Sequence, residues 1–128
     1  MSRTRPIQHG DVLEVAFPVR SPLGREQTGT RPAVVIMLPE LAGYPRYAVA
    51  IVAPLTRDQG QPWIVQGKGL YPIVEANTGG VPLRSVVQLD QITTVDVTRI
   101  KQRLGTLTEA EYAPILERVL RISNPEGA

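Results

Sequence analysis

A chain of 128 residues has room for one domain built around one modest hydrophobic core. Hydrophobic residues make up 42% of the chain and charged residues 20%, a composition that excludes an intrinsically disordered protein. The chain has no cysteine and a single histidine, so the sequence predicts no disulfide, no metal site and no cofactor. The formal net charge is only +2, which by itself does not indicate a nucleic-acid partner.

The cationic residues are nonetheless almost all arginine. Of the 14 lysines and arginines only Lys68 and Lys101 are lysines, which leaves twelve arginines. Arginine presents a planar fork of donors that matches phosphate and can stack on bases, so this usage permits an RNA partner, although genome composition can produce it too. No apolar run reaches the roughly 18 residues of a membrane-spanning helix, and the first residues lack a secretory signal. We therefore expect a cytoplasmic protein without a membrane segment.

The first half of the chain predicts strands. Apolar residues alternate imperfectly over Asp11–Phe17, and Pro18 ends this candidate. Residues 32–38 and 49–55 are continuous apolar runs, typical of strands buried on both faces, and we expect them at the centre of the sheet. Residues 19–30 contain a proline, two glycines and three charged residues, so they predict an exposed loop.

The second half begins with weaker signals. Residues 64–66 and 71–75 are strand candidates in a glycine-containing region. Gly79 and Gly80 predict a turn before a further strand at 84–89, and residues 92–96 form the last strand candidate.

From Thr108 the apolar period becomes helical. Thr108 and Glu111 have the spacing of a capping box, which marks the start of a helix. The apolar positions that follow the 3.6-residue period are Tyr112, Ile115, Leu116, Val119 and Ile122. Pro114 lies inside this segment and predicts a bend or a late start, because it lacks the N–H that a helix interior needs. Asn124 and Pro125 predict the end of the helix.

These elements predict one domain that is mainly β with a C-terminal helix. We expect an N-terminal segment at residues 1–9, the domain at 10–123 and a frayed tail at 124–128. The chain shows no internal repeat and no linker.

No nucleophile, metal or phosphate-loop motif occurs in the chain. His9 near the N-terminus is more typical of an exposed polar residue than of a catalytic base. Arg31 directly precedes the buried run at 32–38, and Thr56 directly follows the run at 49–55, so both stand at strand ends where a rigid scaffold can hold a site. From composition and spacing alone, a solvated strand-entry charge at Arg31 and a turn residue at Thr56 are the favoured interpretations.

Five segments, in their order and separation, resemble the MazF/PemK family of toxins. They are HGDVLEVAF at 9–17, REQTGTRPAVVI at 25–36, AIVAPLTRD at 50–58, RSVVQLDQITTVD at 84–96 and LGTLTEAE at 104–111. Each segment alone is a weak signal, but together with the terminal helix they span nearly the whole chain.

The resemblance implies a homodimer of small SH3-like β-barrels that acts as the toxin of a type II toxin–antitoxin system and is inhibited by a cognate antitoxin. It implies metal-independent cleavage of single-stranded RNA at short sequence motifs, with 2′,3′-cyclic phosphate and 5′-hydroxyl ends. The family's catalytic arginine falls on Arg31 and its catalytic hydroxyl on Thr56. Glu26, Gln27 and Asp90 match positions that line the family's site, and they are the supporting or general-base candidates.

Three positions depart from the family's pattern. Arg25 stands where relatives often carry histidine, and Thr93 stands where many carry arginine. Gln88 replaces an arginine that the Kid/PemK branch has two residues before the matching aspartate. A mechanism in which that arginine is the general acid is therefore not expected here.

Contact with RNA needs more than the reacting phosphate. The candidate RNA-binding residues are Arg20, Arg25, Arg57, Trp63 and Arg84. Trp63 follows polar residues, which permits stacking on a base, while burial in the core is an equally good interpretation.

Three other interpretations of the sequence stay open. A toxin of the same fold, such as the CcdB gyrase poisons, binds a protein and needs no nuclease site, although Arg31 with Thr56 argues against it. A non-catalytic SH3-like binding module would use the same polar residues only in turns. A catalytically intact toxin that is permanently silenced by its partner would differ in physiology and not in chemistry.

Overall fold

The computed structural model describes residues 5–19, 21–22 and 24–126, and this part of the chain is mainly β with a C-terminal helix, as the sequence predicts. The strands are β1 (Asp11–Phe17), β2 (Gly29–Met37), β3 (Val49–Arg57), β4 (Ile73–Val74), β5 (Ser85–Val87), β6 (Thr93–Asp96) and β7 (Ile100–Thr106). The helices are α1 (Pro62–Gln66) and α2 (Glu109–Ser123), with 3-10 turns at Pro39–Leu41, Leu89–Gln91 and Val97–Arg99. No helix in these residues is long and apolar enough to cross a membrane.

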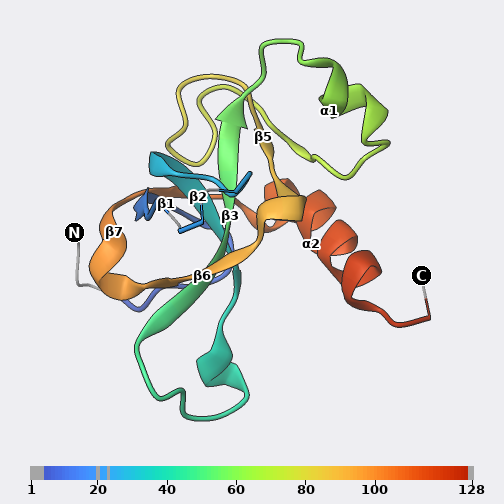
Figure 1. The fold of residues 1–128 in the computed structure, drawn as a ribbon. Helices are drawn as coiled ribbons and strands as arrows, with labels where there is room; N and C mark the ends of the chain where they lie inside the picture. Colours follow the sequence, from blue (N-terminus) through green and yellow to red (C-terminus); the bar gives the residue numbers. More distant parts are fainter. Residues whose placement is uncertain (1–4, 20, 23, 127–128) are drawn as a thin grey trace.

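All strand pairs are antiparallel, and β3 runs through the middle of the molecule (Figure 1). The strand order is β4-β5-β3-β2-β1-β7, and β6 also pairs with β3. One edge of β3 pairs with β2, while the other edge pairs first with β6 and then with β5. Within the described residues no ladder joins β6 to β7, so the predicted barrel is an open, curved sheet.

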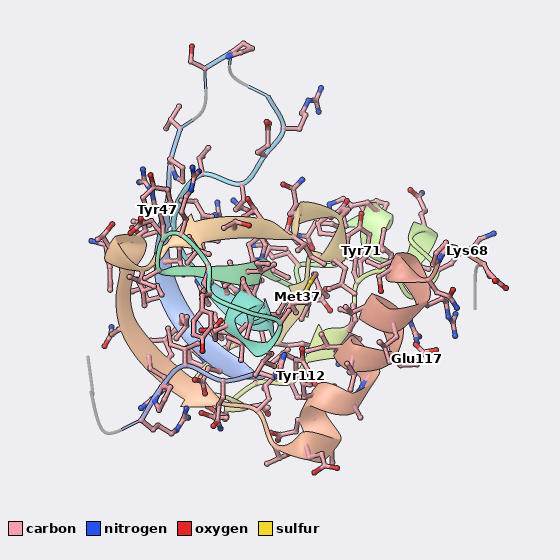
Figure 2. The ribbon with its side chains drawn as sticks, turned by 90° about the horizontal axis from the view of Figure 1, so that it is seen from below. Met37, Tyr47, Lys68, Tyr71, Tyr112 and Glu117 are labelled. Carbon is pink, nitrogen blue, oxygen red and sulfur yellow. The ribbon has the colours of Figure 1, made fainter. Side chains whose placement is uncertain are left out.

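Alternate residues of the central strands face two different cores, which confirms that the runs at 32–38 and 49–55 are buried on both faces. The core toward α2 contains Val12, Val34, Ala53, Leu55, Tyr112, Ile115 and Val119. The core inside the curved sheet contains Leu13, Val15, Ala33, Val35, Val52 and Val95. In Figure 2, Tyr112 lies on the side of α2 that faces the sheet. Because a shift of one residue would exchange the two cores, the register of these strands is fixed.

Three parts of the predicted strand pattern differ from the structure. Residues 64–66 belong to helix α1, which begins at Pro62 because the fixed φ of proline suits the first helical position. Strand β7 was not predicted, since it is an edge strand with exposed Lys101 and Gln102 and lacks a clear apolar alternation. The strand expected at 84–89 is shorter than predicted, because a 3-10 turn begins at Leu89.

The glycine pair at 79 and 80 forms the predicted turn and contacts the backbone of β7. Both glycines have positive φ, 60° and 80°. A Cβ at Gly80 would lie 2.1 Å from the carbonyl oxygen of Leu104, and a Cβ at Gly105 would lie 2.5 Å from the carbonyl carbon of Gly79. Only glycine allows the two backbones to approach this closely.

Helix α2 has the predicted capping box. The Thr108 hydroxyl accepts from the Glu111 N–H at 3.1 Å, and the Glu111 carboxylate accepts from the Thr108 N–H at 2.8 Å. Pro114 predicts a bend or a late start, and the late start does not occur, because the helix begins at Glu109. Leu116 and Ile122 are 43% and 51% exposed, so the predicted stripe is wider than the buried face.

Replacement of Pro114 by alanine should stabilise the protein. Pro114 is exposed and leaves the Ala110 carbonyl without its usual helical donor, so alanine restores one hydrogen bond at no cost in packing. We expect the free energy of unfolding in urea to rise by about 1 to 3 kcal/mol. Pro125→Ala, beyond the helix end, is the control and should change it little. A Pro114→Ala protein less stable than wild type would contradict this account.

A buried carboxylate joins the N-terminal segment to the sheet. The Asp11 side chain is 0% exposed and accepts from both terminal nitrogens of Arg5 at 3.0 and 2.8 Å, from the Gln8 N–H at 2.9 Å and from the Thr106 hydroxyl at 2.8 Å. Arg103 lies 3.7 Å away as a second cation. Burial by itself would raise the pKa of Asp11, but these hydrogen bonds outweigh it and the pKa lies below its ordinary value of 3.8.

Asp11→Asn should destabilise the fold at neutral pH by about 3 kcal/mol, because it removes the charge that these donors stabilise. Since the pKa of Asp11 is lower in the folded than in the unfolded chain, its contribution is complete above 3.8 and is lost as pH falls below that value. Urea unfolding at pH 7 and pH 3 should therefore differ less for the variant than for wild type. Glu40→Gln, at an exposed carboxylate in the 3-10 turn after β2, is the control. Equal pH dependence in wild type and Asp11→Asn would refute the assignment.

Candidate active site

The structure brings Arg31 and Thr56 to one hollow. The pairs Val34–Ala53 and Ala33–Pro54 fix the register of β2 against β3, and its continuation by two residues places Arg31 opposite Thr56. Both line an open hollow of about 270 Å³ at this end of the strands. Its other lining residues are Thr30, Pro32, Leu55, Arg57, Val81, Pro82, Leu83 and Ser85.

The floor of this hollow is rigid. Thr56 pairs with Val86 of β5, and the neighbouring Leu55 is only 2% exposed. Ser85 is 6% exposed, and its hydroxyl donates to the Leu83 carbonyl at 2.9 Å. The Thr56 hydroxyl is therefore presented from a strand held on both of its edges.

The guanidinium of Arg31 is held at one nitrogen and open at the other two. Its Nε donates to the Thr28 carbonyl at 3.2 Å, which fixes the plane of the group. Among the residues that the structure describes, Arg31 forms no ion pair, and its two terminal nitrogens donate to no protein oxygen. A half-buried, oriented guanidinium of this kind can bind two oxygens of a phosphate.

Glu26, Gln27 and Asp90 line a second hollow, of about 290 Å³, and not the hollow that holds Arg31 and Thr56. The two hollows are linked by the Thr28 carbonyl, which accepts from Gln27 Nε2 at 3.4 Å as well as from Arg31. Glu26 and Asp90 are exposed, and Gln27 is half-buried.

A chain of glutamine side chains supports the second hollow, and sequence reasoning missed it. Gln88 Nε2 donates to Gln27 Oε1 at 2.8 Å, and the Gln27 N–H donates to Gln91 Oε1 at 3.2 Å. Gln91 Nε2 in turn donates to the Arg25 carbonyl at 3.3 Å. The sequence signal was the pair of glutamines three residues apart, which the 3-10 turn at Leu89–Gln91 directs toward the loop before β2.

The arginines among the RNA-binding candidates differ in whether protein carboxylates already form ion pairs with them. Arg20 lies outside the described residues. Arg25 and Arg57 are exposed, and Arg57 lines the hollow of Arg31 and Thr56.

Arg84 is held by two carboxylates. It donates to Asp58 at 3.0 Å and to Glu75 at 3.2 Å. The pKa of Asp58 is lowered by a hydrogen bond from the Gly60 N–H and by Arg84. Arg84 therefore ties the turn after β3 to the segment after β4, which reduces the charge it presents to a polyanion.

Trp63, the remaining RNA-binding candidate, lies in α1 and is half-buried. Its ring meets Tyr71 edge to face, with ring centroids 4.7 Å apart and an interplanar angle of 77°. Both rings line a third hollow, of about 210 Å³, together with Gln88, Asp90 and Gln91. Sequence reasoning did not select Tyr71, because only the fold brings it to Asp90.

His9 lies apart from these hollows and is exposed, with its ring 6.5 Å from that of Tyr112. In the described ranges, no group of three or more histidine, aspartate or glutamate side chains is arranged to hold a metal ion.

Comparison with known proteins identifies the family to which this chain belongs. Residues 8–123 match the PemK-like, MazF-like toxins of type II toxin–antitoxin systems. The chain belongs to this family. A relative named "Probable endoribonuclease MazF5", from Mycobacterium tuberculosis (strain ATCC 25618 / H37Rv), is 34% identical over 89 residues, which cover 70% of this chain and 74% of the relative. A toxin of a type II system has an antitoxin as its partner, so membership of the MazF-like family confirms that expectation.

Proposed function

We propose that this MazF-like toxin is a metal-independent endoribonuclease that cuts single-stranded RNA in the hollow between β2 and β3. The observation that carries the proposal is that Thr56 and Arg31 line the same hollow and that the two terminal nitrogens of Arg31 have no protein acceptor among the described residues. RNA supplies its own nucleophile in the 2′-hydroxyl, so the protein must mainly align the phosphate and stabilise its developing charge. The products are a 2′,3′-cyclic phosphate and a 5′-hydroxyl.

In this mechanism Arg31 binds the phosphate with its two terminal nitrogens, while the bond from Nε to Thr28 keeps the fork oriented. Thr56 donates a further hydrogen bond to the same phosphate. As the 2′-hydroxyl attacks, negative charge grows on the non-bridging oxygens, and these donors stabilise it without reorganisation.

The general base is assigned to Glu26. Its carboxylate accepts no hydrogen bond from the protein in the described part of the chain, whereas Asp90 already accepts from the Tyr71 hydroxyl at 2.6 Å. Gln27 is a supporting residue, because it shares the Thr28 carbonyl with Arg31. Glu26 takes the 2′-hydroxyl proton as the 2′-oxygen bonds to phosphorus; the bond from phosphorus to the 5′-oxygen breaks, and that oxygen receives a proton from water.

The proposal also covers the toxin's oligomeric state and its location in the cell. We propose a homodimer that acts on mRNA in the cytoplasm. The antitoxin would block the RNA by lying across the exposed arginines beside the hollows, and acidic side chains would favour that contact.

Arg31→Ala and Thr56→Val should each lower the rate of RNA cleavage by a factor on the order of 10² to 10³, because each removes a donor to the charged phosphate. The measurement is cleavage of a long unstructured RNA in EDTA, with the ends mapped and their phosphates identified. Arg99→Ala, an exposed arginine in the turn before β7, is the matched control.

Near-normal cleavage by Arg31→Ala would remove Arg31 from the mechanism. Intact RNA with the wild-type protein in large excess, across varied sequences, would overturn the nuclease and favour a gyrase-poison or binding role.

Arg57 should contribute more to RNA affinity than Arg84, because Arg84 is already neutralised by Asp58 and Glu75. Each phosphate contact to a single strand contributes about 0.7 to the slope of log affinity against log salt. Arg57→Ala should lower this slope by about that amount, and Arg84→Ala by clearly less. Fluorescence anisotropy with a labelled, uncleavable 2′-O-methyl RNA measures both; equal slopes for the two variants would contradict the ranking.

A further inference from the structure

The hollow of Trp63 and Tyr71 has features that the cleavage mechanism does not use. It measures about 210 Å³ and is lined by Trp63, Tyr71, Gln88, Asp90 and Gln91. Two of these five side chains are aromatic, and the other three are a carboxylate and two amides. An aromatic wall beside a few fixed polar groups is the usual composition of a small-ligand pocket.

The aromatic wall suits a flat ring. Trp63 and Tyr71 meet edge to face, so this contact occupies a face of only one ring and leaves ring surface for a third. Stacking on exposed tryptophan and tyrosine is the general way in which proteins hold unpaired bases of a single strand.

The polar side of the hollow presents hydrogen-bond acceptors. The Tyr71 hydroxyl donates to Asp90 Oδ2 at 2.6 Å, which fixes the carboxylate and leaves Oδ1 with no protein donor among the described residues. Gln88 uses its Nε2 to donate to Gln27, so its Oε1 is a second acceptor. The bond to Asp90 raises the pKa of Tyr71 to about 12, so the hydroxyl stays a donor at physiological pH.

The negative charge of Asp90 also favours one part of an RNA over another in this hollow. A phosphate beside Asp90 would meet like charge, whereas a base that carries N–H donors would meet an acceptor. Adenine, cytosine and guanine each have an exocyclic amino group, and carboxylates accept from such groups in base recognition. Uracil has no amino group, and its one base-edge donor, the ring N3–H, lies between two carbonyl oxygens that would face the carboxylate as acceptors.

We infer that the hollow of Trp63, Tyr71 and Asp90 is a base-reading subsite that accepts an amino-bearing base of the RNA and discriminates against uracil. The inference rests on the proposed RNA-cleaving function and assigns one determinant of its sequence preference. Asp90 contacts the base, and Tyr71 is a positioning residue that acts through Asp90.

The subsite is connected to the proposed catalytic arginine. Gln88 lines the subsite and donates to Gln27, Gln27 donates to the Thr28 carbonyl, and Arg31 donates to the same oxygen. A base held beside Gln88 therefore lies at one end of a hydrogen-bonded chain whose other end orients the phosphate-binding group.

Trp63 is the only tryptophan of the chain, so its fluorescence reports on this hollow directly. The probes are short 2′-O-methyl oligonucleotides that are identical except for one central base in a uridine background. Wild-type Trp63 emission should be quenched on binding, and oligonucleotides with central adenine, cytosine or guanine should bind about tenfold more tightly than the all-uridine probe.

Three variants separate base reading from a structural role. Asp90→Asn replaces one acceptor by a donor, so it should shift the preference toward uracil. Tyr71→Phe keeps the ring and should weaken the discrimination. Tyr44→Phe makes the same change on a fully exposed tyrosine of the loop between β2 and β3 and should leave the preference unchanged. Urea unfolding of each variant checks that the fold is intact.

The inference is overturned by binding, seen by anisotropy, without quenching of Trp63. Equal affinity for uracil and amino-bearing probes, or an unchanged preference in Asp90→Asn, would overturn it as well. Cleavage of ordinary RNA by the wild type with an unaltered motif in both Asp90→Asn and Tyr71→Phe would retain the nuclease and reject the subsite. Selective quenching together with uncut RNA would retain the subsite and reject the nuclease.

Discussion

Strand β3 is hydrogen-bonded along both edges, and the rest of the molecule depends on this arrangement. One edge pairs with β2 throughout the core, and the other is divided between β6 and β5. Side chains of β3 contribute to both hydrophobic cores, so the strand cannot move without exposing apolar surface on one side. Thr56 directly follows the buried run of β3, so its position is fixed by the most constrained strand of the fold.

The candidate site combines this rigid strand end with a less constrained loop. Thr56 and Arg31 come from the paired strands, whereas Glu26 and Gln27 come from the segment before β2, which is held by glutamine side chains and few buried contacts. Charge stabilisation needs fixed donors, and selection of a substrate needs surfaces that can differ between relatives. In the proposed mechanism the sheet provides the fixed donors, and in the proposed subsite the loop and α1 provide the surface that selects the substrate.

Elements with a clear local pattern, such as an unbroken apolar run, could be predicted from the sequence. Elements that form only because a distant segment pairs with them could not. The runs at 32–38 and 49–55 and the capping box at Thr108 depend on local pattern, and the structure has them. Strand β7 is ordered by pairing with β1, and its own residues carry little apolar signal. The same distinction holds for the site. Arg31 and Thr56 could be selected from the sequence, because they stand beside apolar runs and match the family's catalytic positions. Tyr71 reaches Asp90 only through the path of the chain around α1.

The contact between the Gly79–Gly80 turn and β7 is made by backbone atoms, with the turn leading directly into the Val81, Pro82 and Leu83 wall of the Arg31 hollow. A contact of this kind offers no side chain that can be exchanged for a larger or smaller one. Any larger residue at position 79, 80 or 105 would therefore push the turn away from β7, and this wall of the Arg31 hollow would move with it.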